Sequence, residues 1–456
     1  MGREEEENEE DELENMEQVL FQGPMYGRET DLKQNARLVK AALVPVKRMM
    51  SSALGRRAHT ILLEPANGRF SIRFVIDGIP YPAGAVPGQR GMAMVQMLKV
   101  LSGLNPQERA AAQSGGIFAE FEGTKFHLLV SATPLKPGVE KLMIQVENPK
   151  ITHTKASDAK MPADLAKQLR DFTEDSKGII LACGPPQSGV TSLSITALHC
   201  VDPYMYSVFS MADTGGKELT NVTDFAPEDG HDLEMSFDRV LRREADLIYM
   251  NPLTDPAVVQ TMFNFADKVC FVAEIPANTP FEAIQKLIAW VGKDEVAKKV
   301  KCIITQKLIR LLCDDCKQAF RPNPQLLQRL GLPPETTVLY RAPSPPAEDD
   351  ENAPTIEELC EDCDGVPFHG RAPVYEVLEM TEGMKAVVCD NFQLEAVKEQ
   401  MVKDGMRTLQ KDAIRLVAEG KTALEEVQRT FRPPAPAGAR RRPAPKGKPR
   451  PRPRPE

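Results

Sequence analysis

Residues 184–192 have the glycine spacing of a loop that could bind phosphate. The apolar run Ile179–Cys183 before them predicts a buried strand, and Thr191–Leu198 after them predicts a helix. A glycine-rich turn between a strand and a helix presents backbone N–H groups to an anion, which the positive end of the helix also favours. The chemistry that this stretch could support is therefore the binding of phosphate groups, as in a nucleotide.

The candidate phosphate loop fits the pattern G-x-x-x-x-G-K-[ST] at Gly184, Gly189 and Thr191. The lysine of that pattern is missing, because Val190 occupies its position, so the cation expected beside the outer phosphates is absent. Thr191 could hold Mg²⁺ through its hydroxyl, but we interpret it as the N-cap of the helix. The loop consists of Gly184, Pro185, Pro186, Gln187, Ser188, Gly189, Val190, Thr191 and Ser192.

Two C-x-x-C pairs form the second candidate site. Together they supply four thiolates, the ligand set of a closed, structural zinc site. The stretch 317–359 between the pairs is longer than a compact zinc ribbon needs, and the Pro- and acid-rich residues 342–354 account for much of the excess. The alternatives are free surface thiols or redox pairs, although two matched pairs are hard to obtain by chance. The candidate zinc ligands are Cys313, Cys316, Cys360 and Cys363.

Composition narrows the class of protein. A length of 456 residues suggests roughly three domains. With 42% hydrophobic and 27% charged residues and a net charge of −8, the chain is typical of a soluble, mildly acidic protein rather than a nucleic-acid binder. No apolar run approaches the ~18 residues of a membrane span, and the acidic start is unlike a secretory signal. Nine cysteines are few for this length, which favours a reducing compartment.

Both ends of the chain are expected to be tails. Residues 1–31 are strongly acidic and predict disorder. Within them, Val19–Pro24 resembles a viral 3C-protease cleavage site, either introduced during cloning or native, and is left out of the fold prediction. Residues 431–456 alternate Pro with basic residues, which predicts an extended tail. Such a tail contacts an acidic partner, a membrane surface or nucleic acid, or simply aids solubility.

A small α+β domain is predicted over residues 32–150, followed by a helix-bearing linker over residues 151–177. Its expected helices and strands are Leu32–Leu54, Thr60–Leu63, Arg69–Ile76, Met92–Leu101, Gly116–Glu122, Phe126–Thr133 and Glu140–Glu147. Turns are expected at residues 66–68 and 77–78.

Apolar runs alternate with helical stretches from residue 178 to about residue 305, which predicts a mainly parallel sheet covered by helices. A further short strand and a helix are expected over Lys301–Cys316, and Gly383–Phe431 is expected to be helical. The predicted strands of the core are Ile179–Cys183, Tyr206–Met211, Asp246–Met250 and Val269–Ile275. The predicted helices are Thr191–Leu198, Phe237–Arg243, Ala257–Phe265 and Phe281–Val291. The remaining cysteines lie in apolar stretches and are interpreted as core residues.

An ordered set of motifs resembles the ATPase family of type II secretion and type IV pilus assembly, the GspE/PilB group. The resemblance covers about residues 58–427. In the first half it is carried by Leu63-Glu64-Pro65, Ile76-Asp77-Gly78, Lys99, Ser102-Gly103-Leu104, Glu108-Arg109, the phosphate loop, Asp213 and Arg239-Val240-Leu241-Arg242. In the second half it is carried by Gln306–Lys317, the second cysteine pair, Gly370-Arg371, Val374–Leu378, Asp404-Gly405-Met406, Thr408-Leu409, Glu419–Thr422 and Glu425-Glu426-Val427.

This sequence departs from the family pattern at its charged positions. Val190 replaces the phosphate lysine, and Ala212 replaces the glutamate of the family's Asp box beside Asp213. The Walker B strand begins at Asp246, but Pro252 stands at its glutamate position. Thr254 stands at an arginine position, and Val269 and Pro276 replace the two histidines of the His box. The positions of arginines that the family directs at the nucleotide carry Val75, Ala110, Gly116, Leu129 and Gln145, whereas Arg73 and Arg109 remain.

The resemblance implies an α/β fold with four parts: the small α+β domain, a RecA-like P-loop NTPase core over residues 178–306, a tetracysteine zinc subdomain over 307–382 and a helical subdomain over 383–430. It implies a cytoplasmic protein, peripheral to the inner membrane, in a homo- or hetero-oligomeric ring that is a hexamer by resemblance, with structural Zn²⁺ and at most weak ATP and Mg²⁺ binding. We expect a catalytically degenerate, structural or regulatory subunit of a secretion or pilus machine, paired with an active paralogous ATPase. The alternatives are an active ATP-hydrolysing motor and a subunit that binds nucleotide without hydrolysis.

Overall fold

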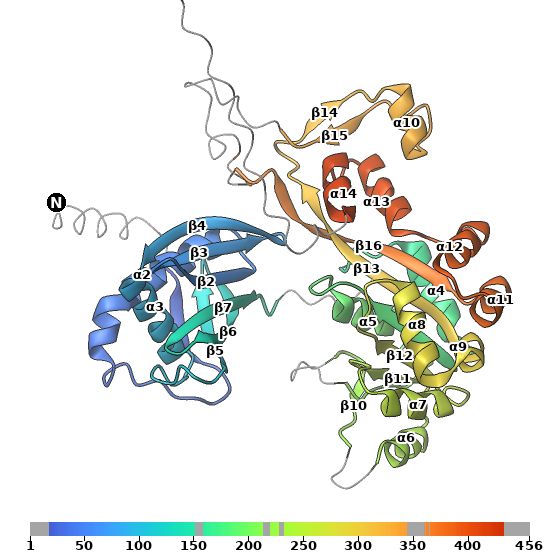
Figure 1. Ribbon diagram of the computed structural model, residues 1–456, viewed down its shortest axis with the longest axis horizontal. Coiled ribbons are helices and arrows are strands. Elements are labelled where there is room, and N and C mark those ends of the chain that lie inside the picture. The colour runs from blue at the N-terminus through green and yellow to red at the C-terminus, as the bar shows by residue number, and fades with distance from the viewer. Residues whose placement is uncertain are drawn as a thin grey trace, which may run out of the picture.

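The computed structural model describes residues 18–150, 158–212, 219–227, 232–343, 360, 362–363 and 365–432. These residues form an N-terminal domain, a core domain and a cysteine-bearing end that extends from the core (Figure 1). Among them, no helix is both long enough and apolar enough to cross a membrane. Residues 1–17 and 433–456, which make up most of the two expected tails, lie outside the described part of the chain.

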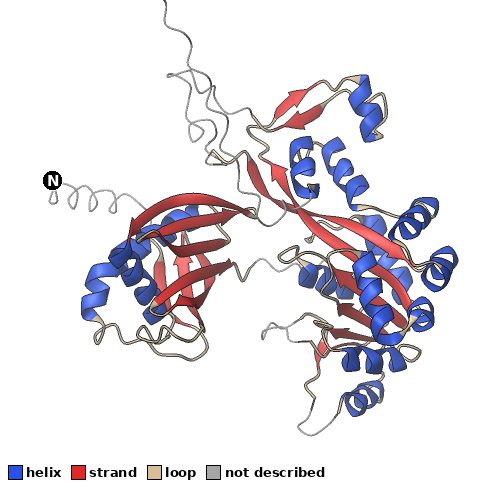
Figure 2. Ribbon diagram, in the orientation of Figure 1, coloured by secondary structure: helices blue, strands red, loops and turns tan. Residues whose placement is uncertain are grey.

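The N-terminal domain is a seven-stranded antiparallel sheet with the order β1-β5-β6-β7-β2-β3-β4. Two helices, α2 and α3, cover one face and share a hydrophobic core with the sheet (Figure 2). Their bounds are α2 (Ala36–Gly55) and α3 (Gly88–Leu101). The strands are β1 (Leu20–Pro24), β2 (Thr60–Ala66), β3 (Arg69–Ile76), β4 (Ile79–Pro87), β5 (Gln113–Phe121), β6 (Thr124–Lys136) and β7 (Val139–Glu147).

Both edge strands of this domain differ from the sequence prediction. The segment Val19–Pro24, which resembles a protease site, is part of the fold. Leu20–Pro24 forms β1 on β5, and Val19 is fully buried with its N–H donated to Ser51 Oγ at 2.9 Å. Residues 18–31 thus belong to the domain rather than to a tail. The opposite edge, β4, contains Pro80 and Pro82, which an edge strand tolerates because its outward N–H groups need no partner.

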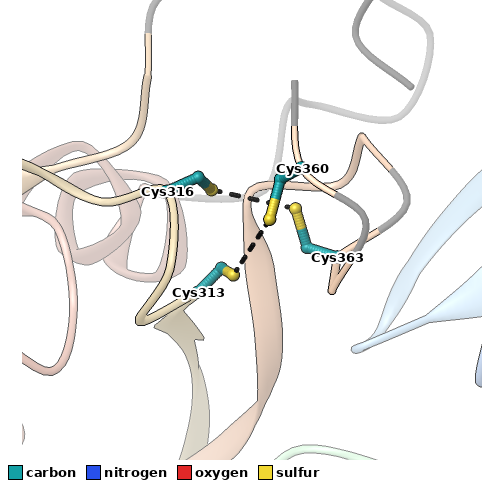
Figure 3. A group of neighbouring side chains, drawn as sticks. All are labelled: Cys313, Cys316, Cys360 and Cys363. Atoms are coloured by element: carbon teal, nitrogen blue, oxygen red, sulfur yellow. Dashed lines mark hydrogen bonds between the residues drawn. The ribbon is translucent and has the colours of Figure 1, made fainter. Parts of the chain in front are cut away.

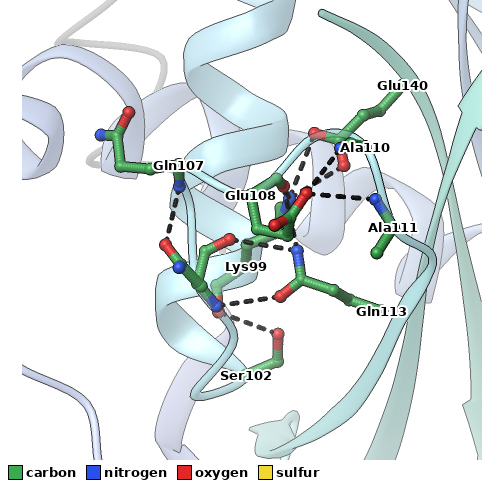
Figure 4. Close-up of polar contacts among 9 residues, drawn as sticks. Lys99, Ser102, Gln107, Glu108, Ala110, Ala111, Gln113 and Glu140 are labelled. Carbon is green, nitrogen blue, oxygen red and sulfur yellow. Dashed lines mark hydrogen bonds and ion pairs between the residues drawn. The ribbon is translucent and has the colours of Figure 1, made fainter. Parts of the chain in front are cut away.

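A buried ion pair fixes the loop that follows α3 (Figure 4). Lys99 Nζ lies 2.8 Å from Glu140 Oε1, and both side chains are fully buried. Lys99 also donates to the carbonyl of Glu108, and the Glu108 carboxylate accepts the N–H groups of Ala110 and Ala111 at 2.6 and 3.1 Å. Gln113 closes the same loop by donating to the Glu108 carbonyl. The motif around Lys99 is therefore a rigid structural unit.

The core domain is a sheet of order β10-β9-β11-β12-β8-β13-β16, in which every pair is parallel except β13 with β16. This confirms the mainly parallel sheet predicted from the sequence. Its strands are β8 (Gly178–Cys183), β9 (Val208–Ser210), β10 (Thr223–Asp224), β11 (Leu247–Met250), β12 (Cys270–Glu274), β13 (Val300–Leu312) and β16 (Phe368–Glu379).

Helices cover both faces of the core sheet, as β8 shows. Ile179 and Leu181 point into one hydrophobic cluster, and Ile180 and Ala182 into another. The first cluster receives α6 (Leu233–Leu241), α7 (Pro256–Phe265), α8 (Pro280–Val291), α9 (Lys293–Lys299), α11 (Glu382–Asp390) and α12 (Leu394–Lys403). The second receives α4 (Ala163–Thr173) and α5 (Val190–His199).

The linker expected over residues 151–177 is only partly a linker. Residues 151–157 lie outside the described chain, whereas α4 buries Leu165, Ala166 and Leu169 against the core sheet. Because one apolar face of an amphipathic helix must be covered, α4 is part of the core domain.

The strands β13 and β16 form a long hairpin that carries the cysteine-bearing end (Figure 1). The short helix predicted before the first cysteine pair is wrong: the β-branched and leucine-rich residues 300–312 continue as one strand through the boundary expected at residue 306. Beyond the hairpin lie β14 (Gln318–Phe320), β15 (Leu339–Arg341) and α10 (Pro324–Leu330). Two C-terminal helices, α13 (Leu409–Ala418) and α14 (Leu424–Phe431), pack against the hairpin.

Arg310 on β13 joins three parts of the chain. Its guanidinium donates to Glu426 Oε2 of α14 at 2.7 Å and to the Tyr81 hydroxyl of β4 at 3.2 Å, and it stacks 3.8 Å from the centre of the Phe368 ring. Nearby, the Asp77 carboxylate accepts the N–H of Gly370 at 3.1 Å. The N-terminal domain therefore contacts the base of the cysteine-bearing end.

Candidate nucleotide pocket and metal centre

The phosphate loop connects the end of β8 to the start of α5 and requires glycine at both signature positions. Gly189 has a φ of 82° and is the N-cap of α5. A Cβ on Gly184 would lie 2.5 Å from Ser188 Oγ and 2.6 Å from the carbonyl oxygen of Gln306. The predicted N-cap at Thr191 is wrong, because Thr191 lies inside the first turn of the helix.

The loop is held from β13 by Gln306. Its side-chain amide donates to the carbonyl oxygens of Ser188 and Gly189 at 2.8 and 3.0 Å. The Ser188 hydroxyl is buried and has no hydrogen-bond partner among the described residues. The loop thus has the shape of a phosphate loop and one unused donor.

A cavity of about 550 Å³ opens between this loop and the carboxyl ends of the neighbouring strands. Ligand pockets of open α/β sheets occur at this edge, and its volume is within the ~300–1,000 Å³ of small-molecule sites. None of the described lining residues is a lysine, arginine or histidine. They are residues 184–192, Pro252, Glu274, Ile275, Pro276, Ala277 and Asn278.

Glu274 is the one ionisable side chain in this lining. It ends β12 and is 9% exposed. Its Oε2 accepts the Thr191 hydroxyl at 3.1 Å, and its Oε1 accepts the Tyr249 hydroxyl at 2.5 Å. Asn251 donates to the same phenol oxygen at 3.1 Å. Burial, and then the Glu274 carboxylate, raise the pKa of Tyr249 far above its usual value, so the phenol remains a donor.

The sequence prediction missed Glu274. Glu274 lies in the stretch Val269–Asn278, where the family pattern points only to the two histidine positions, Val269 and Pro276. A glutamate that ends the otherwise apolar run Cys270–Ala273 beside the phosphate loop was the available signal. A charged residue at the carboxyl end of a buried strand faces the functional edge of such a sheet.

Three substituted positions lie where apolar contacts replace charge. Val190 and Ala212 are partly buried against the hydrophobic cluster on the α5 face of the sheet. Pro252 lines the cavity. A lysine from outside the lining, Lys286, donates to the carbonyl of Pro276, but it lies 3.5 Å from the Glu282 carboxylate.

The acidic residue of the Walker B motif does not lie at the cavity. Asp246 precedes β11, at the amino end of the parallel strands, where it accepts the Ser207 N–H at 2.8 Å and the Ser176 hydroxyl at 3.0 Å. It therefore lies at the end of the sheet opposite the phosphate loop and fixes the start of β11. Asp213 lies outside the described residues. Of the two arginines retained in the N-terminal domain, Arg73 pairs with Glu64.

The four predicted zinc ligands lie together at the cysteine-bearing end (Figure 3). Their sulfur atoms are all within 4.8 Å of one another. Cys313 Sγ is 3.7 Å from Cys360 Sγ, and Cys316 Sγ is 3.8 Å from Cys363 Sγ. Disulfides, which need sulfurs about 2.05 Å apart, are therefore not formed.

The cysteine geometry fits a tetrahedral metal. With Zn–S bonds of about 2.3 Å, the sulfurs of a tetrahedral site are about 3.8 Å apart, which matches the two close pairs. Burial, and then the hydrogen bond with Cys360 Sγ, raise the pKa of the Cys363 thiol to about 12. A metal ion would displace such protons. Beside the group, Asp362 Oδ2 accepts the Cys313 thiol at 3.2 Å and lies 3.0 Å from His369 Nδ1.

The parallel sheet, the glycine-rich loop at its carboxyl edge and the tetracysteine hairpin define a P-loop ATPase-like architecture. The chain belongs to the Type II/IV secretion system protein family, whose model matches residues 35–429. The resemblance stated from the motifs is thereby confirmed.

Three relatives are similar to this chain over most of its length. The chain is 26% identical over 398 residues to the protein transport protein HofB homolog of Escherichia coli K12, which covers 85% of this chain and 81% of that protein. It is 24% identical to the type IV pilus assembly ATPase PilB of Thermus thermophilus, covering 84% of this chain but 42% of PilB. It is 23% identical to the type II secretion system protein E of Xanthomonas campestris, covering 85% and 68%.

Solved structures show the fold. The ATPase DotB of Legionella pneumophila matches with a TM-score of 0.52 and 13% identity, over 88% of this chain and 96% of DotB. DotB of Yersinia pseudotuberculosis also matches with a TM-score of 0.52, at 12% identity. At these identities the matches define the α/β ATPase fold and not the activity.

Proposed function

We propose that this chain is a catalytically degenerate member of its family, a structural or regulatory subunit of a type II secretion or type IV pilus assembly machine. The observation that carries this proposal is the charge of the cavity at the phosphate loop. Its described lining holds one carboxylate, Glu274, and no cationic side chain. A nucleotide triphosphate would therefore meet a negative charge where it needs positive ones.

Phosphoryl transfer depends on positioning and on stabilising negative charge. Val190 supplies no cation, Pro252 supplies no carboxylate, and Asp246 lies at the wrong edge of the sheet. Single losses of this kind can cost ~10³-fold in rate. Together they leave, among the described residues that line the cavity, no set that could bind Mg²⁺, order the attacking water and stabilise the transition state.

A phosphate-release assay at saturating Mg·ATP tests this proposal. We expect no turnover above that of a mock purification. Turnover that is lost in Thr191→Ala would contradict it and would instead support the alternative of an active motor. Glu282→Gln is a suitable control, because it changes a carboxylate near the cavity rim without touching the loop.

A second candidate function is nucleotide binding without hydrolysis. It is favoured by the loop geometry, since Gly184, Gly189 and the unpartnered Ser188 hydroxyl are all in place. A ligand that binds only the folded state raises the unfolding midpoint. A rise with Mg·ATP but without turnover would support this function.

We further propose that the chain works at the cytoplasmic side of the inner membrane as part of an oligomeric ring, with itself or with an active paralogue, and that its four cysteines hold a structural Zn²⁺. The relatives named for pilus assembly and type II secretion support the first statement, and the sulfur geometry supports the second. Co-purification from the source organism tests the partner, and metal analysis of the purified chain tests the ion.

A further inference from the structure

We propose that Glu274 is a specificity-determining residue that excludes nucleotide phosphates from the loop, because its carboxylate is a fixed internal anion at the start of α5. This inference rests on the proposed function and explains how the cavity avoids nucleotide while it keeps the loop's shape. It assigns to Glu274 a role other than catalysis.

The position of the carboxylate supports this role. Thr191 is in the first turn of α5, and its hydroxyl, which a bound Mg·nucleotide would need, is donated to Glu274 Oε2. The positive end of a helix stabilises an anion within its first turn. Glu274 supplies that anion from β12, so the helix end is electrostatically satisfied without a ligand.

The second oxygen of the carboxylate is fixed as well. Tyr249 donates to Glu274 Oε1 at 2.5 Å, and Asn251 holds the phenol oxygen from the other side. Glu274 is 9% exposed and accepts two hydroxyl donors, so its carboxylate cannot turn away to admit a phosphate without leaving the Tyr249 hydroxyl with no acceptor.

The Glu274 carboxylate also affects what a lysine at the family's loop position could do. A lysine at position 190 would lie on the same loop as Thr191 and would be attracted to the carboxylate rather than to a nucleotide. Restoring the lysine alone therefore does not restore the site. The loop still has the unused Ser188 hydroxyl, so charge rather than a lack of donors excludes the phosphate.

Calorimetric titration of the full chain with Mg·ATP, and separately with inorganic phosphate, tests the role of Glu274. The variants are Glu274→Gln, Val190→Lys and the two combined. Glutamine keeps the shape and can bond both hydroxyls, because a hydroxyl both donates and accepts. We expect Glu274→Gln to tighten binding about tenfold or more. We expect Val190→Lys alone to change little, and the double variant to gain more than the product of the single effects.

The matched control is Glu295→Gln, which makes the same change in net charge outside the cavity lining and should leave binding unchanged. Unfolding midpoints without ligand verify that each variant folds, and Glu274→Thr repeats the test if the glutamine variant does not. Tight Mg·ATP binding by the unaltered chain, or no gain in any Glu274 variant, would overturn the role of Glu274. Neither result contradicts the proposal that the chain is catalytically degenerate. Only ATP turnover by the unaltered chain would contradict that proposal.

Discussion

The cavity at the phosphate loop and the tetracysteine group differ in how many of the family's chemically active side chains are present. At the first, the glycines keep the backbone shape, while the charged positions hold Val190 and Pro252. At the second, all four side chains with chemistry are present and lie at the distances that a metal needs. The difference teaches that a loop can have the backbone shape of a site without the charged side chains of the family pattern, whereas the cysteine group has both the shape and the ligand atoms of a metal site.

The largest effect is expected when the cysteines are replaced. In Cys313→Ser combined with Cys316→Ser, we expect bound metal to fall from about one ion per chain to nearly none, because two of four ligands are lost. The free energy of metal binding is also folding free energy, so the hairpin end should become sensitive to protease. Metal analysis and limited proteolysis measure both effects. Cys389→Ser, outside the group, should change neither, and a native chain with much less than one ion would refute the metal site.

Lys99 is a lysine of the family motifs that this chain retains, in contrast to the loop lysine, whose position holds Val190. We expect Lys99→Met to destabilise the N-terminal domain by ~3–5 kcal/mol, because it leaves Glu140 as an unpaired buried charge. Lys99→Met combined with Glu140→Leu should recover most of this loss. Urea unfolding measures it, and a loss below ~1 kcal/mol for the single variant would show that the pair is not structural.

His59 tests whether the N-terminal domain depends on its contact with the cysteine-bearing end. Burial, and then the Arg371 guanidinium, lower the pKa of His59 to about 4. The unfolded chain takes up the proton first, so the stabilising contribution is complete above pH ~6.5 and is lost as the pH falls toward 4. Because the ring is partly exposed, we expect a change of about 1–2 kcal/mol between pH 7.5 and 5.

Unfolding of His59→Gln over the same pH range provides the control, since glutamine keeps an acceptor for the Gly78 N–H but does not titrate. An unchanged pH dependence in this variant would show that other groups are responsible.

The smallest expected effect is at Val190. We expect Val190→Lys to lower stability by ~1 kcal/mol, because the side chain is partly buried against apolar neighbours, and to leave the unfolding midpoint insensitive to Mg·ATP. Thermal unfolding with and without nucleotide measures both, with Val190→Ala as the packing control. A rise of several degrees with Mg·ATP would show that the lysine alone separates this loop from a working one.

Local sequence patterns predicted much of the fold. The core strands and helices follow from apolar runs and helical periodicity, and the turn at residues 66–68 is confirmed by the positive φ of Asn67 and Gly68. The two edge strands were missed for different reasons. Prolines in β4 oppose a strand locally, and β1 was excluded because of its resemblance to a protease site.

The site was predictable where ligands come in sequence motifs, and not where they meet through the fold. The four cysteines can be recognised from the spacing of two C-x-x-C pairs. Glu274 does not, because its role depends on β12 lying beside β8, which places its carboxylate against Thr191 across many residues of sequence. The opposite holds for Asp246, which belongs to the Walker B motif in the sequence but lies at the amino end of its strand, away from the phosphate loop.

The β13–β16 hairpin has a consequence for the order of folding. Its strands pair from Cys302 with Glu379 to Leu312 with Phe368. When Leu312 pairs with Phe368, the 55 residues 313–367 are closed into one loop. Loop closure costs entropy that grows with length, and such non-local contacts form slowly. The cysteine pairs lie near the two ends of that loop. An ion that cross-links them would shorten the search, so these two strands of the seven-stranded sheet would pair faster when metal is present.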